Sequence, residues 1–428
     1  MLFCIANTAQ GQKEIISLDS LLAYTDARST VLASNDIKYL QAKQTKLAAI
    51  LGIADFNANV SLNVTNNTTL PVSLFPAETF GGEPGTFREV QTGIQYTNNL
   101  NLYADVKLLN VAGWQNLRLA KININITKVD NKLSKKTMQE NIAASYYNII
   151  NLQSQLLYTS QNLSAADTIY NIVSSKYGQG IAKRQDVNDA LVNKVSTQES
   201  VTQIAYMIMQ QYKALKLLCD IPEDDSILLL NKIDIDYPPN IIQPTFNDLS
   251  LTQSALKEKY ALAYYRQIKT TMLPTLSAFG SNTDQQFNTQ FSLFDENVKW
   301  INSNYIGLKA VWQIPNTSTI SQTTKAKYEY KLAQQNTNHS RLQATLDFEK
   351  LQIEAEKTKA SAINQQQIYM LRADTYQKNL ESYREGILSL DMLLNSYNAM
   401  VNSRYNLVSA LSNHLLTNSK IKINNSIR

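Results

Sequence analysis

The residues best placed for acid–base chemistry are two short acid clusters, Asp224-Asp225 and the pair Asp234 and Asp236. Neighbouring carboxylates can serve as general acid and base when their surroundings separate their pKa values. Both clusters lie in a proline-containing connector over 221–245, where solvated carboxylates are typical. The sequence contains no phosphate loop, nucleophile elbow, His-Glu-x-x-His or Cys-x-x-Cys motif. We therefore predict a protein that is not an enzyme and that uses no cofactor.

Metal and redox chemistry receive little support from the sequence. The two histidines, His339 and His414, are too few for a His-based metal site, and we expect each to be an exposed helix residue. The two cysteines, Cys4 and Cys219, are far apart in the chain. Removal of the first residues would leave Cys219 alone, so we expect no internal disulfide.

Charge and composition exclude two further classes of protein. The 40 Lys and Arg residues are interspersed with 35 Asp and Glu residues, for a net charge of +5. No basic block of the kind that marks a nucleic-acid footprint is present, so we expect no nucleic-acid partner. Hydrophobic residues make up 44% of the chain, which is too many for a disordered protein.

The N-terminus resembles the end of a secretory signal. Residues 1–6 are mostly apolar, and Ala9-Gln10-Gly11 has small residues where signal peptidase reads them. We predict cleavage after Gly11, and no lipid anchor, because Phe3 precedes Cys4. No run of about 18 apolar residues occurs, so a membrane could be spanned only by a closed β-barrel.

The hydrophobic period changes along the chain and predicts both helices and strands. Strict apolar–polar alternation over 59–65 and 100–108 is the strand pattern. Two stretches without Pro or Gly, 114–176 and 319–382, carry apolar residues at helical spacing. Each would be roughly 95 Å long at 1.5 Å per residue, which is typical of coiled coils or of the staves of a tube.

The same order of elements occurs twice. After a signal remnant over 1–11, repeat 1 spans 12–220, a connector spans 221–245, and repeat 2 spans 246–428. Repeat 1 is predicted to contain a helix over 16–54, strands 57–66 and 94–109 around a Pro- and Gly-rich loop, a long helix 114–176 and a return helix 186–219. Repeat 2 is predicted to contain a helix over 246–272, strands 275–287 and 304–314, a long helix 319–382 and a return helix 391–420.

Matching turns link the two repeats and point to a known family. Tyr177-Gly178-Gln179-Gly180-Ile181 aligns with Tyr383-Arg384-Glu385-Gly386-Ile387. The order of elements, the opening Ile16-Ser17-Leu18-Asp19, the strand entry Leu273-Pro274-Thr275-Leu276-Ser277 and the Tyr-x-x-Gly-hydrophobic turn resemble the TolC-type outer-membrane efflux proteins. The resemblance covers nearly the whole chain beyond the signal remnant.

This resemblance implies a mixed, mainly α fold and a trimer. Four strands from each protomer would close a twelve-stranded outer-membrane β-barrel, continued by a long periplasmic α-helical barrel. It implies a passive duct of a tripartite efflux or type I secretion system in the outer membrane of a Gram-negative bacterium. The implied partners are two further copies of the chain, a periplasmic adaptor, an inner-membrane pump of the RND or ABC type, and outer-membrane lipid.

The strands and turns supply the candidate site residues. The predicted lipid-facing residues are Val60, Leu62, Val64, Leu102, Val106, Leu308 and Trp312. The predicted lumen-facing residues are Asn59, Ser61, Asn63, Asn101, Asp105, Lys107 and Lys309. Tyr96, Trp300 and Trp312 are candidates for aromatic girdles.

By resemblance, the glycine turns form the periplasmic tip. Gly180, Ile181, Gly386 and Ile387 would dock the adaptor, and Asp186, Asp189, Tyr383 and Asp391 would gate the tip. Threefold symmetry would bring the carboxylates into a ring that favours cations. Repeat 2 departs from the family pattern, because Met392 occupies the position that matches Asp186.

Two other classes stay open at this point. A soluble coiled-coil scaffold would explain the long helices but not the paired strands between them. An unrecognised enzyme would require an acid–base cluster converging in a pocket. The sequence does not identify the cargo, which could be a drug, a metal or a protein.

Overall fold

A computed structural model of the chain describes residues 13–15, 17–225, 227–229, 232–235, 240–291 and 299–427. The predicted signal remnant over 1–11, Cys4 and Asp236 lie outside these residues. The contacts divide the chain into a helical unit (Met1–Tyr39, Ile126–Ala255 and Asn336–Arg428) and a sheet unit (Leu40–Asn125 and Leu256–Gln335). Among the helices described, none is both long enough and apolar enough to cross a membrane.

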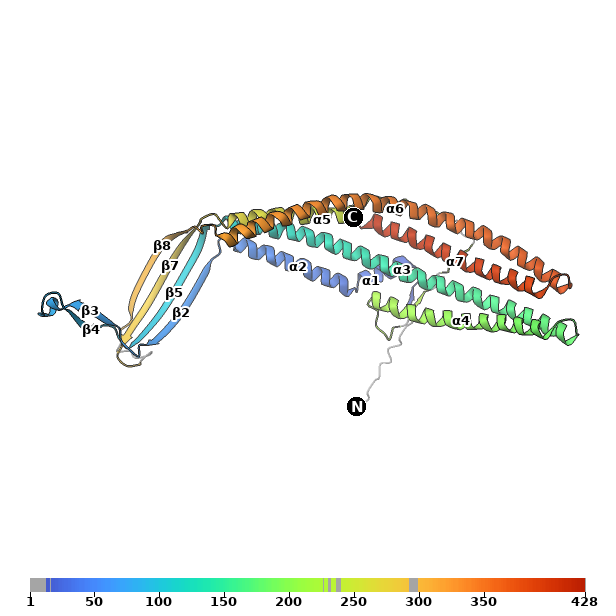
Figure 1. Cartoon of the computed structure of the whole chain (residues 1–428), viewed down its shortest axis with the longest axis horizontal. Coiled ribbons are helices and arrows are strands. Elements are labelled where there is room, and N and C mark those ends of the chain that lie inside the picture. Colours follow the sequence, from blue (N-terminus) through green and yellow to red (C-terminus); the bar gives the residue numbers. More distant parts are fainter. Residues whose placement is uncertain are drawn as a thin grey trace, which may run out of the picture. The chain divides into compact units, whose positions relative to one another are not determined.

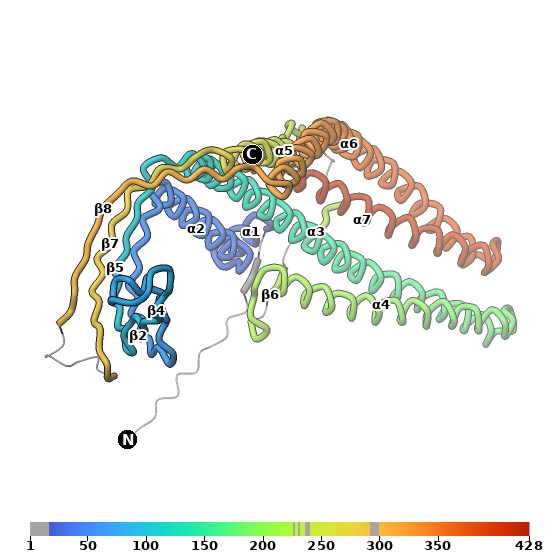
Figure 2. The backbone as a smooth tube through the Cα atoms, turned by 60° about the vertical axis from the view of Figure 1, so that its left-hand side comes forward, coloured from blue at the N-terminus to red at the C-terminus, as the bar shows by residue number. Residues whose placement is uncertain are grey.

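Two long helical hairpins dominate the chain (Figure 1). α3 (Val111–Gly178) returns as α4 (Arg184–Leu218), and α6 (Thr317–Arg384) returns as α7 (Leu390–Ser426). Figure 2 shows the same two hairpins as tubes, each closed by a short turn. Helices of this length gain most of their stability from packing, so their buried faces must meet partners along the hairpins.

Two apolar cores hold the helical unit together. The larger core joins α1, α3, α4, α6, α7 and the connector through residues such as Leu21, Ile142, Leu215 and Leu407, which are fully buried. A second core near the turns, the tip core, joins α3, α4, α6 and α7. Its buried members are Ala166, Ile169, Val173, Ala190, Tyr376, Tyr383, Leu390, Leu393, Tyr397 and Met400. The two hairpins are therefore packed against each other close to their turns.

The single helix predicted over 16–54 is wrong, because the chain breaks it into α1 (Leu18–Asp26) and α2 (Thr30–Leu51). Ser29 causes the break: its Oγ accepts the N–H groups of Val31 and Leu32, at 3.2 and 3.4 Å. The carboxylate of Asp220 accepts the N–H of Thr30 at 2.8 Å. Capping bonds of this kind satisfy the donors that a new helix leaves unpaired.

The connector also contains a strand that periodicity did not predict. β6 (Ile227–Leu229) pairs in parallel with β1 (Lys13–Ile15). Each has only three residues, which is too short for an alternation pattern to be recognised.

The sheet unit contains one four-stranded antiparallel sheet in the order β2-β5-β7-β8. Its strands are β2 (Asn57–Asn66), β5 (Tyr96–Leu109), β7 (Thr275–Asn288) and β8 (Ile301–Val311). α5 (Leu249–Thr270) precedes β7. The last strand begins and ends three residues earlier than the predicted 304–314. Each repeat contributes two neighbouring strands of this sheet, so the predicted fold class is confirmed: mainly α, with a four-stranded sheet and two structural repeats.

The loop predicted between the first two strands folds into a hairpin. β3 (Val72–Pro76) pairs with β4 (Phe87–Gln91), and a 3₁₀ turn, η1 (Ala77–Phe80), follows β3. Pro71 and Pro76 made this segment read as a loop, because proline is uncommon within strands. Here one proline precedes β3 and the other ends it.

Candidate functional site

The register of the sheet divides its side chains between two unlike faces. Val60 lies opposite Leu102, and Val106 aligns through Ala278 with Leu308. Successive residues of a strand point to opposite faces, so the face of Val60 and Leu102 carries a band of apolar residues, with Asp284 and Asn302 beyond it. Of the predicted lipid-facing residues, the register places six on this apolar face: Val60, Leu62, Val64, Leu102, Val106 and Leu308.

The opposite face is polar. The register places all seven predicted lumen-facing residues on it: Asn59, Ser61, Asn63, Asn101, Asp105, Lys107 and Lys309. Lys107 forms an ion pair with Asp55, just before β2. Asn101 accepts hydrogen bonds from the hydroxyls of Ser281 and Thr283, at 2.7 and 3.2 Å. A sheet with one exposed apolar face and one polar face is suited to lie between hydrocarbon and water.

The apolar band crosses the strands at a slant. On β2 it surrounds Leu62, whose partner on β5 is Leu100. On β8 it surrounds Leu308, which aligns through Ala278 with Val106, six residues further along β5. A level band of hydrocarbon would cut tilted strands along such a slanted line. The pattern thus fits strands tilted relative to a membrane.

Aromatic residues mark both ends of the sheet. Tyr96 opens β5 and meets Phe291 edge to face at 6.0 Å, while Trp300 directly precedes β8. Trp312 lies at the opposite end, one residue beyond β8. Its indole N–H donates to the carbonyl of Met272 at 2.9 Å. Trp312 is therefore exposed at the end of the sheet rather than within the strand predicted for it.

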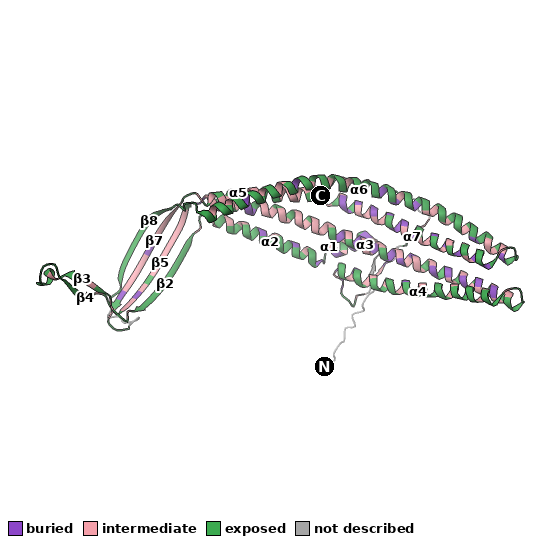
Figure 3. Cartoon of the chain, viewed as in Figure 1, coloured by how far each residue is buried: buried purple, intermediate pink, exposed green. Residues whose placement is uncertain are grey.

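The sheet has two open edges. β2 and β8 each pair on one side only, within the part of the chain that the structure describes. These edges are ten and eleven residues long. Figure 3 shows both edge strands as largely exposed, with β5 and β7 between them less so. Long edges leave unpaired N–H and C=O groups and favour pairing with another chain.

The two hairpin turns have the same backbone structure. Gly180 and Gly386 have φ values of 75° and 80°, which side chains other than glycine's rarely tolerate. The N–H of Ile181 donates to the carbonyl of Lys176 at 2.9 Å, and the N–H of Ile387 donates to that of Ser382 at 2.9 Å. These equivalent bonds reverse the chain after a long helix. The two sequence repeats therefore share the same backbone hydrogen bonds at their turns.

Each turn carries one exposed isoleucine. Ile181 is 70% exposed and Ile387 is 75% exposed, and both directly follow the left-handed glycine. The two exposed isoleucines occupy matching positions, so each offers an apolar surface that a partner protein can contact. Of the predicted docking residues, all four therefore lie in the turns, with both isoleucines accessible.

Tyr383 joins the two hairpins instead of lying free at the tip. Its side chain is buried in the tip core. The ammonium of Lys176, on α3, donates to the carbonyl of Tyr383 at 2.7 Å and lies 4.2 Å from its ring centroid. Burial, and next the charge of Asp186, raise the pKa of the Tyr383 phenol. Lys176 was missed by sequence reasoning because its partner belongs to the other repeat.

The predicted carboxylates differ in their surroundings. Asp186 accepts the N–H of Lys183 at 2.8 Å and so caps the start of α4. Asp189 and Asp391 are exposed near the N-termini of α4 and α7, and neither forms an ion pair with another described residue. The structure thus brings Asp186 and Tyr383 together, while Asp189 and Asp391 remain open to solvent. Asp186 and Asp391 lie in the first turns of α4 and α7, where the helix dipole stabilises a carboxylate.

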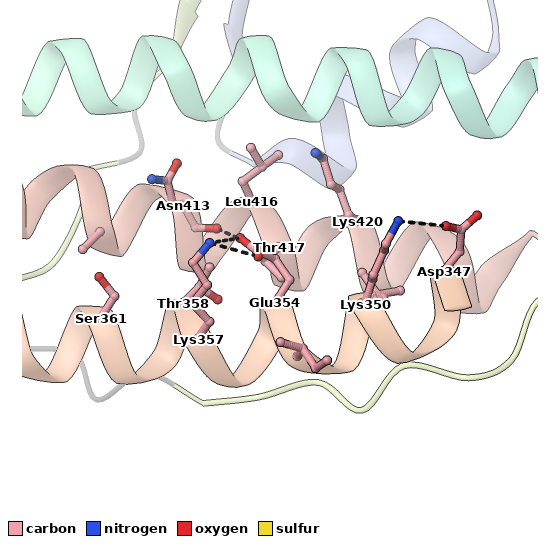
Figure 4. Close-up of a pocket in the computed structure, with 13 residues that line it drawn as sticks. Asp347, Lys350, Glu354, Lys357, Thr358, Ser361, Asn413, Leu416, Thr417 and Lys420 are labelled. Carbon is pink, nitrogen blue, oxygen red and sulfur yellow. Dashed lines mark hydrogen bonds and ion pairs between the residues drawn. The ribbon is translucent and has the colours of Figure 1, made fainter. Parts of the chain in front are cut away.

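A groove with a volume of about 730 Å³ lies between α6 and α7 (Figure 4). Four of its charged residues form ion pairs along α6: Lys357 with Glu354 at 3.2 Å, and Lys350 with Asp347 at 3.9 Å. Successive ion pairs between neighbouring turns of one helix are typical of a helix surface. They do not converge on a common point, as an acid–base pair must.

The prediction that His414 is exposed is wrong, since only 2% of it is accessible. Its Nε2 lies 2.8 Å from the carbonyl of Asn240, which requires that this nitrogen carry the proton. Burial lowers the pKa of His414 below its usual value. The residue fastens the connector to α7. His339 is exposed, as predicted.

Comparison with known proteins agrees with this architecture. Residues 57–219 match the family model described as outer membrane efflux protein. No curated protein sequence matches the chain. The predicted resemblance to the outer-membrane efflux proteins is confirmed over that segment, which contains the first two sheet strands and the first hairpin.

Solved structures match nearly the whole chain. The outer membrane protein VceC from Vibrio cholerae is 15% identical, with a TM-score of 0.73 and 95% of each chain covered. CusC is 14% identical, with a TM-score of 0.74, covering 95% of this chain and 91% of its own. The CmeC outer membrane channel of Campylobacter jejuni is 16% identical, with a TM-score of 0.70, covering 95% and 85%. At these identities the similarity establishes the fold.

Proposed function

We propose that this chain is one protomer of an outer-membrane export duct. It shares its fold with solved outer-membrane channels and a sequence segment with the outer membrane efflux proteins. The observation that carries the proposal is the two-faced sheet with its slanted apolar band and open edges. The duct is passive, and it performs no chemistry on its cargo.

Closure of the sheet requires further copies of the chain. In lipid every backbone polar group must be paired, so the free edges of β2 and β8 cannot remain open. Antiparallel pairing of β2 from one copy with β8 from the next satisfies both edges. The family resemblance supports three copies, which would give twelve strands, an even number as in other bacterial barrels.

The apolar face then lies against outer-membrane lipid and the polar face lines a water-filled lumen. Val60, Leu62, Val64, Leu102, Val106 and Leu308 contact acyl chains, and Trp312 lies at an interface. The helical hairpins then lie in the periplasm of a Gram-negative cell. The duct thereby receives cargo on the periplasmic side and releases it outside.

The turns are the docking surface for a periplasmic adaptor. Gly180-Ile181 and Gly386-Ile387 present two equivalent apolar points, which suit an adaptor that meets both repeats alike. An inner-membrane pump of the RND or ABC type supplies the driving force. The gate lies at the same tip: Tyr383 is held in the link between the hairpins, and Asp186, Asp189 and Asp391 give the entrance a cation preference.

Electrical recording tests the proposal directly. The purified protein, extracted from outer membranes in detergent, is added to a planar lipid bilayer and the current is recorded under voltage. A duct gives discrete conductance steps, and replacing a tip carboxylate, as in Asp391→Asn, reduces cation preference. A protein that stays soluble without detergent and gives no steps would support the coiled-coil scaffold instead.

A further inference from the structure

The polar face of the sheet carries a row of three aromatic rings. Tyr103 on β5, Phe279 on β7 and Tyr305 on β8 occupy three adjacent strands (Figure 1). The ring centroids of Tyr103 and Phe279 are 6.3 Å apart, at an interplanar angle of 28°. Those of Phe279 and Tyr305 are 6.0 Å apart, at 74°. The remaining residues of this face are mostly Asn, Ser, Thr and charged residues, so the row interrupts a polar surface.

A glycine makes the row possible. Gly307 lies directly opposite Phe279 on the neighbouring strand. A Cβ atom on Gly307 would lie 2.9 Å from Cζ of the Phe279 ring. Because Gly307 has no side chain, the Phe279 ring can lie across β8. It lies between Tyr103 and Tyr305, which are both paired with Ser281 on β7.

The row keeps ring surface open to solvent. Tyr305 is 54% exposed, and Tyr103 and Phe279 are half-buried. If the row served only to cover the sheet above Gly307, Phe279 alone would be sufficient. Two flanking tyrosines widen it into a flat aromatic surface on the face that meets water.

The charge beside the row is negative. Asp105 lies directly opposite Phe279 and two residues from Tyr103, and it forms no ion pair with any residue that the structure describes. The charge of Lys107 is compensated by Asp55. The other cation on this face, Lys309, lies on β8, separated from Asp105 by β7. Ring faces attract cations, and a nearby carboxylate strengthens that attraction.

We propose that Tyr103, Phe279 and Tyr305, together with Asp105, form a binding site for planar aromatic cations that pass along the polar face. The site rests on the proposed function, which makes this face the lumen and repeats the row three times around it. A flat cation stacks on the rings, and its charge lies towards Asp105. The row thus gives the duct a preference among solutes that its width alone would not supply.

Blockade of the ionic current measures binding in the lumen. Ethidium, a planar aromatic cation, is added to bilayers that contain the reconstituted duct, and tetrapropylammonium serves as the cation without a ring. Ethidium is expected to reduce the potassium current at much lower concentration than tetrapropylammonium. Tyr305→Leu is expected to raise the half-blocking ethidium concentration roughly fivefold, the loss of one exposed ring–cation contact. Asp105→Asn is expected to weaken the block of both cations, and to weaken that of ethidium more.

Phe87→Leu is the matched control. Phe87 is 66% exposed, and it lies on β4 of the β3–β4 hairpin, outside the four-stranded sheet. Its replacement removes an equally accessible ring and should leave the ethidium block unchanged.

Each result decides a different claim. An ethidium block that is unchanged in both Tyr305→Leu and Asp105→Asn would overturn the binding site while leaving the duct intact. A protein that forms no pore would overturn the duct. In that case the fluorescence of ethidium titrated with the detergent-solubilised protein still tests the site, because wild type must bind more tightly than both variants.

Discussion

The link between the hairpins predicts that Lys176→Met loosens the tip. Lys176 donates to the carbonyl of Tyr383 at 2.7 Å and lies 4.2 Å from its ring. A hydrogen bond from a charged donor contributes about 1.5–3 kcal/mol when buried. Because Lys176 is only half-buried, we expect the variant to lose about 1–2 kcal/mol of local stability. Methionine retains the length of the aliphatic chain, so the change in stability reports the loss of the ammonium group alone.

Hydrogen exchange of the turn amides measures this loss. A local destabilisation of about 1–2 kcal/mol accelerates exchange roughly five- to thirtyfold in the segments 175–182 and 381–388. Amides of the larger core, such as those around Ile142, should keep their protection, because they are outside the tip core. In bilayers the same variant should spend more time open.

Tyr383→Phe is the matched control. Phenylalanine retains both the ring and the backbone carbonyl that Lys176 contacts, so exchange at the turns should stay near wild type. If Tyr383→Phe accelerated exchange as much as Lys176→Met, the phenol hydroxyl would hold the tip, and the reasoning from the ammonium would be refuted.

Three further changes test the tip, the sheet and the connector. Gly386→Ala places a side chain at a φ of 80° and should destabilise its turn by about 1–2 kcal/mol, measured by hydrogen exchange. The control Gly178→Ala, at the end of α3, should have a stability within about 0.5 kcal/mol of wild type. Leu62→Arg should cost about 2–4 kcal/mol and reduce the amount of protein in the outer membrane, whereas Ser61→Arg, on the opposite face, should be tolerated. Burial lowers the pKa of His414, so the folded state binds fewer protons than the unfolded state as the pH falls. The contribution of neutral His414 to stability is therefore complete above pH 6.5. It declines as the pH falls from there through the folded-state pKa. Denaturant titrations should show this decline in wild type and a flatter profile in His414→Gln.

Regular patterns allowed the fold class to be predicted. The alternation around Leu62 and Leu102 assigns residues to faces without knowledge of the partner strand, because the side-chain period of a strand is two. The register later placed them on one face. The turns at Gly180 and Gly386 were also recognisable, because a left-handed glycine after a long helix leaves a sequence signature.

Contacts between distant segments could not be predicted. The start of α2 at Thr30 depends on Asp220, which lies 190 residues away, and the burial of His414 depends on the connector at Asn240. Thr30 and His414 are both polar, and neither interrupts the helical period. The periodicity therefore does not distinguish them from ordinary surface positions. The aromatic row has the same origin: Tyr103, Phe279 and Tyr305 are neighbours only through the strand register.

The mass of the membrane-extracted particle tests the central claim most directly. The claim is that one open four-stranded sheet is closed by two further copies of the chain. Light scattering of the detergent-solubilised protein, with the detergent contribution subtracted, should give three times the mass of one chain. A monomer or dimer that needs no detergent would contradict the duct, because the edges of β2 and β8 would then be open to water and the apolar face would need another explanation.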